Sequence, residues 1–137
     1  MPQYLVAMHF PDDYDPSTED EATVREIYAL NDEMDAAGVG LFAGGLAPAS
    51  TAKSVRVQPN GELLVTDGPY LETKEHVGGF SILEAADLDE ILAWARKGAI
   101  VSRKPIEVRE IFFKPSPKQL SGSDNAAGDA GLTDKIR

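Results

Sequence analysis

The feature that most constrains the fold of this chain is the order of its strand-like and helix-like patterns. Apolar runs of strand-forming residues occupy residues 4–10, 39–46, 77–84 and 106–113. Between the first two runs, and again between the last two, apolar side chains recur every three to four residues, the period of an amphipathic helix. The order is therefore strand, helix, strand, then an insertion, then strand, helix, strand.

The ends of the two predicted helices carry residues that favour helix caps. Ser17 and Thr18 are candidate N-caps of the first helix, and Gly38 is a natural C-terminal stop. Asp87 is expected to cap the second helix, which we expect to end at Gly98.

The insertion between the two halves has the pattern of a β-hairpin. Residues 54–58 alternate polar and apolar side chains, residues 62–66 return as a second strand-like run, and Pro-Asn-Gly between them favours a turn. Two βαβ units with an inserted hairpin predict an α+β fold of the ferredoxin-like, split βαβ type. In that fold both helices cover one face of an antiparallel sheet.

Composition limits the partners of the chain. Thirteen basic and 23 acidic side chains give a net charge of −10, which argues against nucleic acid and against anionic membranes as partners. Cysteine is absent, so disulfides, thiolate metal sites and cysteine nucleophiles are excluded. We see neither a signal sequence nor an apolar run of about 20 residues, and we expect a cytoplasmic protein.

The last residues differ in composition from the rest. Residues 115–137 are rich in Ser, Gly, Asp and Ala, with almost no aromatic or β-branched side chains. The sequence predicts one domain over residues 1–114 and a flexible polar tail over residues 115–137.

The most specific motif is Val-Thr-Asp-Gly-Pro-Tyr-Leu-Glu-Thr-Lys-Glu-His-Val-Gly-Gly-Phe at residues 65–80. It resembles the signature of the DGPF branch of the YCII-related proteins, in which Asp-Gly-Pro-Phe precedes Glu-Thr-Lys-Glu and Gly-Gly-Phe. Ala-Gly-Gly-Leu at residues 43–46 and Ile-Glu-Val-Arg at residues 106–109 fit the same pattern in order. The resemblance covers residues 3–113, with Tyr70 where the family usually has Phe.

The resemblance implies a ferredoxin-like protomer whose sheet packs on a second copy, giving a dimeric α/β barrel. This agrees with a physical need, because helices on one face leave the other apolar face without a cover. We therefore expect a homodimer. Members of the branch share a fold more than an established activity, and many are encoded beside alternative sigma factors. The wider group includes proposed enzymes that use a His–Asp pair, with dehydrochlorinase-type elimination among the suggestions.

The signature loop is the first candidate site. Asp67, Lys74 and Glu75 supply opposite charges that could converge on a polar ligand, with the Tyr70 hydroxyl near them. In the alternative, purely structural interpretation, Asp67 caps the turn, and Lys74 pairs with Glu72 or Glu75 at the surface.

His9 and Arg109 complete the candidate residues. His9 ends the first strand, where it either transfers protons near neutral pH or simply bonds to the following turn. Glu107 and Arg109 share one face of a strand, either lining the barrel or forming an exposed or interface ion pair. His76 is a weaker candidate, because family members often carry another polar residue there. Two histidines so far apart give no metal-ligand spacing, and we expect neither metal nor cofactor.

These observations lead to three hypotheses. The first is a binding or accessory protein whose barrel holds a small polar or aromatic ligand, within a stress or sigma-factor circuit. The second is a cofactor-free enzyme of proton transfer or elimination, with His9 or Asp67 as base and Lys74 or Arg109 stabilising negative charge. The third is a purely structural interaction module. An enzyme needs a titratable base facing the cavity, whereas a binder needs only shape and charge.

Overall fold

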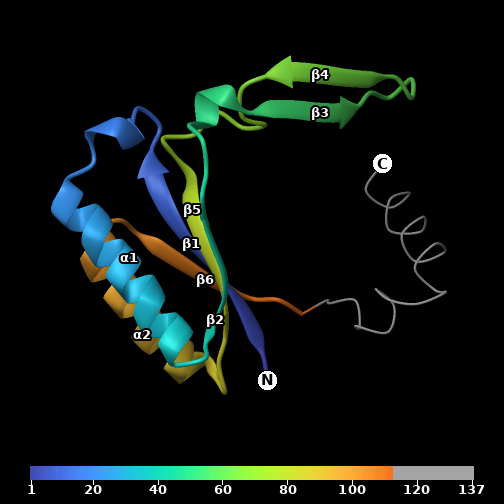
Figure 1. Cartoon of the computed structure of the whole chain (residues 1–137). Helices are drawn as coiled ribbons and strands as arrows, with labels where there is room; N and C mark the ends of the chain where they lie inside the picture. Colours follow the sequence, from blue (N-terminus) through green and yellow to red (C-terminus); the bar gives the residue numbers. More distant parts are fainter. Residues whose placement is uncertain (113–137) are drawn as a thin grey trace, which may run out of the picture.

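The computed structural model describes residues 1–112, and its elements follow the predicted order (Figure 1). The strands are β1 (Gln3–Pro11), β2 (Gly40–Gly45), β3 (Lys53–Val57), β4 (Leu63–Asp67), β5 (Glu75–Glu84) and β6 (Ile106–Glu110). The helices are α1 (Glu21–Ala36) and α2 (Leu88–Ser102), with short 3-10 turns at Pro16–Thr18 and Ala49–Thr51. The α+β prediction is confirmed. The predicted tail, residues 115–137, lies outside the described residues.

The main sheet is open and antiparallel, with strand order β2-β5-β1-β6. Both helices lie on one of its faces (Figure 1). Paired residues of neighbouring strands share a face, so Val6 and its partner Ser81 point to the helices, whereas Ala7 and its partner Phe80 point away. The sheet of this one chain does not close into a barrel. We call its uncovered side the open face.

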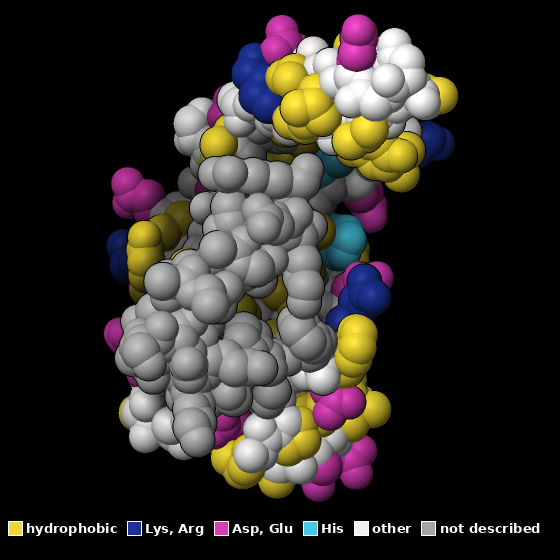
Figure 2. Space-filling model, turned by 90° about the vertical axis from the view of Figure 1, so that its right-hand side faces the viewer, with side chains coloured by type: hydrophobic (Ala, Val, Ile, Leu, Met, Phe, Trp, Pro, Cys, Tyr) yellow, Lys and Arg dark blue, Asp and Glu magenta, His cyan; other side chains and the backbone are white. Residues whose placement is uncertain are grey.

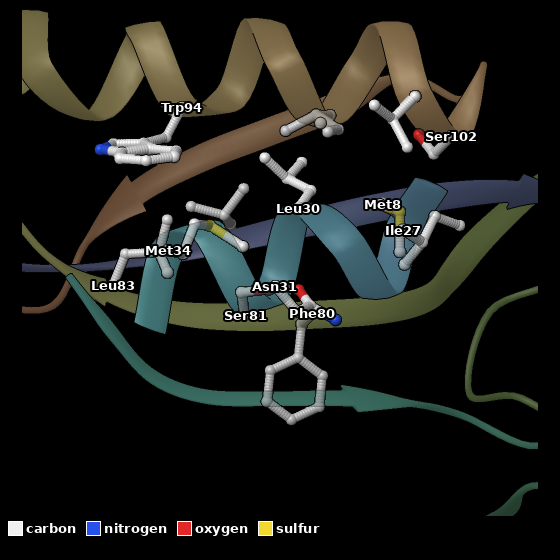
Figure 3. A pocket seen from close by; sticks show the side chains of 14 residues that line it. Met8, Ile27, Leu30, Asn31, Met34, Phe80, Ser81, Leu83, Trp94 and Ser102 are labelled. Atoms are coloured by element: carbon white, nitrogen blue, oxygen red, sulfur yellow. The ribbon is translucent and has the colours of Figure 1, made fainter. Parts of the chain in front are cut away.

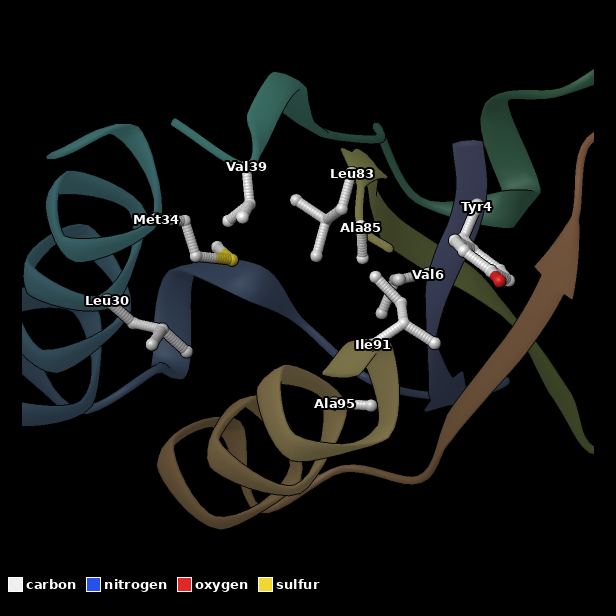
Figure 4. Packing of buried hydrophobic residues seen from close by; sticks show 9 residues of the cluster. All are labelled: Tyr4, Val6, Leu30, Met34, Val39, Leu83, Ala85, Ile91 and Ala95. Atoms are coloured by element: carbon white, nitrogen blue, oxygen red, sulfur yellow. The ribbon is translucent and has the colours of Figure 1, made fainter. Parts of the chain in front are cut away.

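The hydrophobic core fills the space between this sheet and the two helices (Figure 4). Ile91 of α2 is completely buried at its centre, and Leu83 of β5 is nearly so. The other buried members are Tyr4, Val6, Leu30, Met34, Val39, Ala85 and Ala95. No helix in the described part of the chain is long and apolar enough to cross a membrane.

Asp20 caps α1, because its carboxylate accepts a hydrogen bond from a backbone amide of the first turn at 3.2 Å. The prediction that Ser17 or Thr18 caps this helix is wrong. Both residues lie in the preceding 3-10 turn, Pro16–Thr18, which Asp15 caps.

The helix stops were predicted with mixed success. Gly38, in a left-handed conformation with φ +75°, follows the C-terminal cap of α1 as expected, and Asp87 caps α2. The prediction that α2 ends at Gly98 is wrong, since the helix runs on until Arg103. A Cβ at Gly98 would lie 2.9 Å from Cδ1 of Ile106, so this glycine allows close packing of the helix on β6.

The predicted hairpin forms a separate two-stranded sheet of β3 and β4. It projects from one end of the main sheet, on the side away from the helices (Figure 1). We call it the arm. Two hydrogen bonds close its base: the Gly68 amide donates to the Ala52 carbonyl at 2.7 Å, and the Ser54 hydroxyl donates to the Gly68 carbonyl at 2.9 Å.

Candidate functional site

A cleft of about 410 Å³ lies between α1 and the edge strand β2, on the helix-covered side of the sheet. Val24, Ile27 and Tyr28 of α1 form one wall. The opposite wall is the glycine-rich β2, where Ala43 and Gly45 face the helices with small side chains or none. The cleft exists because these small residues do not fill the space beside α1.

A smaller buried pocket of about 50 Å³ adjoins the cleft, between the helices and the sheet (Figure 3). Met8, Ile27, Asn31 and Ser81 line both spaces. The rest of the inner lining is almost entirely apolar and includes Val6, Leu30, Met34, Leu83, Trp94 and Ile106. Cleft and pocket together can hold an apolar group in the pocket and a larger body in the cleft.

Asn31 and Ser81 are the polar side chains where the two spaces meet. The Asn31 amide and the Ser81 hydroxyl can each donate and accept hydrogen bonds. The Ser102 hydroxyl, also in the inner pocket, already accepts a bond from the Lys104 amide at 3.3 Å. The site therefore offers a ligand a small number of hydrogen-bonding groups within an apolar surround.

The glycine pair of the signature motif shapes the floor of the cleft. A Cβ at Gly78 would overlap the ring of Phe10, and a Cβ at Gly79 would lie 2.9 Å from the terminal methyl of Met8. Both Phe10 and Met8 line the cleft. The motif needs glycine at these positions because two large β1 side chains occupy the space in front of β5.

A third hollow, of about 20 Å³, shares Phe10, Gly78 and other residues with the cleft and has room for about one water molecule. His76 and Asp12 line it. Nε2 of His76 lies 2.9 Å from a carboxylate oxygen of Asp12, and the His76 side chain is only 17% exposed, against 63% for Asp12. Such a carboxylate holds an imidazole in one orientation, and an oriented imidazole is a common proton-transfer group.

His76 is thus a stronger candidate than the sequence indicated, and the role of Asp12 was not predicted. The two meet because β1 and β5 are antiparallel and pair Phe10 with His76, which brings the turn after β1 beside the start of β5. The Asp12 amide also donates to the Lys74 carbonyl at 2.7 Å. No local pattern of the sequence indicates this pair, because it depends on the register of β1 with β5, the strand in which the motif ends.

Lys104, a half-buried lysine, contacts two aromatic side chains that line this hollow, Phe10 and Tyr14. Nζ of Lys104 lies 3.9 Å from Glu19 and within 4.9 Å and 5.6 Å of the ring centroids of Tyr14 and Phe10. The Tyr14 hydroxyl donates to the same Glu19 carboxylate. Cation–π contacts and a partly desolvated ion pair fix the turn after β1 against the start of β6.

The structure places the predicted site residues in two other regions. His9 and Arg109 lie on the open face, where His9 pairs with Val77 and Arg109 with Leu5. Glu107 shares this face with Arg109, as strand alternation predicts. The second group lies at the end of the arm strand β4 and after it: Asp67 ends β4, Tyr70 and Lys74 lie in the loop that follows, and Glu75 begins β5. None of these seven residues lines the cleft, the inner pocket or the hollow.

Asp67 and Tyr70 of this group interact with side chains of the arm, whereas Lys74 and Glu75 lie beside the turn after β1. Asp67 pairs with Lys53 across the two strands, at an exposed position. The guanidinium of Arg56 lies over the ring of Tyr70, 5.6 Å from its centroid. Among the described residues, no group of three His, Cys, Asp or Glu side chains could hold a metal ion.

Comparison with known proteins identifies one family. Residues 3–114 match the family described as the YCII-related domain. An uncharacterised protein of Rhizobium meliloti (strain 1021) is 37% identical over 100 residues, which cover 71% of this chain and 80% of that protein.

Proposed function

This chain belongs to the YCII-related family, and from that premise we propose that it is a small-molecule-binding protein that works as a homodimer. The observation that carries the proposal is the cleft of about 410 Å³ with its buried apolar extension. Its volume lies within the usual range of small-molecule sites, roughly 300–1,000 Å³. We place the ligand in this cleft, within each copy, rather than between two sheets.

The lining indicates the class of ligand. A small aliphatic group fits the inner pocket beside Trp94 and Met34, an aromatic ring fits the larger cleft, and one hydrogen-bonding group of the ligand would meet Asn31 and Ser81. The sequence led us to expect a small polar or aromatic ligand. The apolar lining favours a ligand that is mainly apolar and has few polar atoms. Two further parts of the proposal, the accessory role in a sigma-factor circuit and the assignment to the DGPF branch, are supported only by the resemblance of residues 65–80 to the DGPF signature.

The open face supports the homodimer. Phe42 of β2 is 56% exposed there and stacks on Phe80 of β5, with ring centroids 5.6 Å apart. Val77 is exposed beside them, and Leu5 and Ile82 are partly exposed on the same face. An apolar sheet face of this kind gains free energy when a second sheet covers it. Two copies packed in this way would form the family's dimeric α/β barrel.

Ligand binding is tested by thermal shift with a panel of phenols, short aliphatic acids and aromatic amides. Ligands that bind the native state raise its melting temperature. Ala43→Phe places a large side chain in the cleft, and Ala93→Phe adds the same side chain at an exposed position of α2 as a control. Compounds that stabilise the wild-type chain and the Ala93→Phe chain should not stabilise the Ala43→Phe chain. Equal stabilisation of all three would place the site elsewhere.

The contact of His76 with Asp12 favours a second candidate function, a cofactor-free enzyme of proton transfer. His76 would be the base, in place of His9 or Asp67, because it lies beside the cleft. The His76 imidazole would take a proton from a ligand carbon next to a carbonyl, and Asp12 would hold the ring in position for this transfer. The test uses carbonyl compounds that shift the melting temperature. Proton NMR in D₂O should show exchange of their acidic C–H, and His76→Gln should abolish this exchange while the compounds still stabilise the fold. Absence of exchange with the wild-type chain favours the binding function.

A further inference from the structure

The arm has one apolar face that its own chain leaves exposed. Antiparallel pairing joins Val55 to Val65 and Val57 to Leu63, and paired residues share a face. These four side chains are each between 60% and 66% exposed. We call them the arm's apolar face. The opposite face carries Arg56 with other, mostly polar or half-buried, side chains.

A hairpin of this kind needs a cover. β3 and β4 bond only to each other among the described strands, as a sheet separate from the main one. An isolated two-stranded hairpin is marginally stable in water. The four aliphatic side chains lie together on one exposed face. Burying them against another surface removes apolar area from water, which makes association with that surface more favourable.

The direction and length of the arm indicate where that surface lies. The arm extends on the same side as the open face of the main sheet (Figure 1). Seen from that side, hydrophobic side chains gather on the edge of the arm that is turned toward the rest of the molecule (Figure 2). A five-residue strand spans about 17 Å, whereas two packed sheets are about 10 Å apart. The arm is therefore long enough to pass the plane of a second sheet packed on the open face.

We infer that the arm packs its apolar face against a second copy of this chain, so that each copy of the dimer holds the other. The inference rests on the proposed homodimer and adds a second, separate contact to it. The arm lies next to the open face, so both apolar surfaces meet the same partner.

The signature loop holds the base of the arm in place. Gly68 turns the chain back from β4 with φ +94°, and its amide closes the base of the arm on Ala52. Arg56, on the face away from the apolar one, lies over Tyr70. These contacts set the angle at which the arm leaves the sheet, so Gly68 and Tyr70 are positioning residues for the arm.

The first test compares dimer dissociation constants of full-length chains by sedimentation equilibrium. Val57→Asp and Leu63→Asp each place a charge on the arm's apolar face, and Ile100→Asp places the same charge on a position of α2 that is somewhat more exposed. We expect the two arm variants to raise the dissociation constant by at least about tenfold, because the interface would have to bury a carboxylate. Ile100→Asp should change it by less than about twofold.

The outcomes separate the two proposals. A wild-type chain that stays monomeric overturns the homodimer and the arm contact together. A wild-type dimer whose dissociation constant is unchanged by Val57→Asp and Leu63→Asp overturns the arm contact alone.

A second measurement does not depend on the folding of the charged variants. The photoreactive residue p-benzoylphenylalanine replaces Val57 in an unlabelled chain, which is mixed with uniformly ¹⁵N-labelled chain and irradiated. Cross-linked peptides that join one light and one heavy segment are the expected result. Cross-links confined to light segments within a single copy would overturn the inference.

Discussion

Gly78 and Phe10 compete for one volume at the edge of the cleft. Phe10 lies directly over the glycine, in the space that any other side chain would need. The same ring contacts Tyr14 edge-on, at 4.5 Å between centroids, and lies 5.6 Å from the Lys104 ammonium. The absence of a side chain at Gly78 therefore allows Phe10 to pack with Tyr14 and Lys104 between the cleft and the hollow.

Gly78→Ala should reduce the free energy of unfolding by about 1–3 kcal/mol, because the new methyl group displaces the Phe10 ring. Urea denaturation measures the change. Gly45→Ala is the matched control, since a Cβ at Gly45 meets nothing within 4 Å. Addition of Phe10→Ala to the Gly78→Ala chain should cost less than the same change in the wild-type chain. Equal losses at Gly78 and Gly45 would show that the ring moves aside freely.

Ser17 holds the pKa of the Asp15 carboxyl below its ordinary value, through its hydroxyl at 2.7 Å and its backbone amide at 2.9 Å. A lowered pKa in the folded chain stabilises the turn above the unfolded pKa, and this contribution is lost as the pH falls through the folded pKa. Ser17→Ala should therefore move the Asp15 pKa upward in an NMR titration. Thr18→Ala should leave it unchanged, because the Thr18 hydroxyl donates to the Asp15 backbone carbonyl and not to its carboxylate.

Single residues were predictable from the sequence only where the cause is local. Asp87 and Gly38 act through the backbone next to them, and both were assigned correctly. The contact between His76 and Asp12 joins positions 64 apart in the sequence. It depends on the register of two strands, which no local pattern specifies.

At the scale of helices and strands, the existence of each element followed from periodicity, whereas the start of α1 and the end of α2 were predicted wrongly. Three residues before α1, Ser17, Thr18 and Asp20, all favour an N-cap, and only the 3-10 turn ahead of the helix leaves the role to Asp20. Gly98 was mistaken for a stop because a glycine that ends a helix and one that admits a neighbouring strand look alike in sequence.

The backbone at the C-terminal cap of α2 is strained, and a substitution can test this. Arg103 adopts the left-handed conformation, with φ 57°, which a residue with a Cβ enters at a cost. Arg103→Gly should stabilise the fold by about 0.5–1 kcal/mol in urea denaturation, since glycine adopts this conformation freely. Arg96→Gly, in the interior of the same helix, should instead destabilise it by about 1 kcal/mol. A loss of stability at both positions would mean that the Arg103 side chain outweighs the backbone strain.

At the scale of the whole molecule, the two faces of the sheet serve different parts of the proposed function, ligand binding and dimerisation. The cleft lies on its helix-covered face, and the apolar residues that we propose for dimerisation lie on its open face. A dimer formed through the open face would meet the cleft at Phe80, which lines the cleft as well, and the wall on α1, on the other side of the sheet, stays accessible in each copy. The sequence predicted the fold and the half-covered sheet, because both follow from element order. It did not predict the cleft, because this space depends on how far α1 stands from β2.

The net charge of −10 gives the proposed dimer a defined response to salt. Two copies of equal charge repel each other, and the Debye length falls from about 30 Å at 0.01 M salt to about 8 Å at 0.15 M. If apolar contacts of the open face and the arm hold the dimer, its dissociation constant should decrease as salt rises over this range. Sedimentation equilibrium at several NaCl concentrations measures the trend. An ion pair of Glu107 with the partner's Arg109 as the main contact would give the opposite slope, because salt weakens exposed ion pairs more than apolar contacts. The sign of the slope thus identifies which side chains of the open face carry the association.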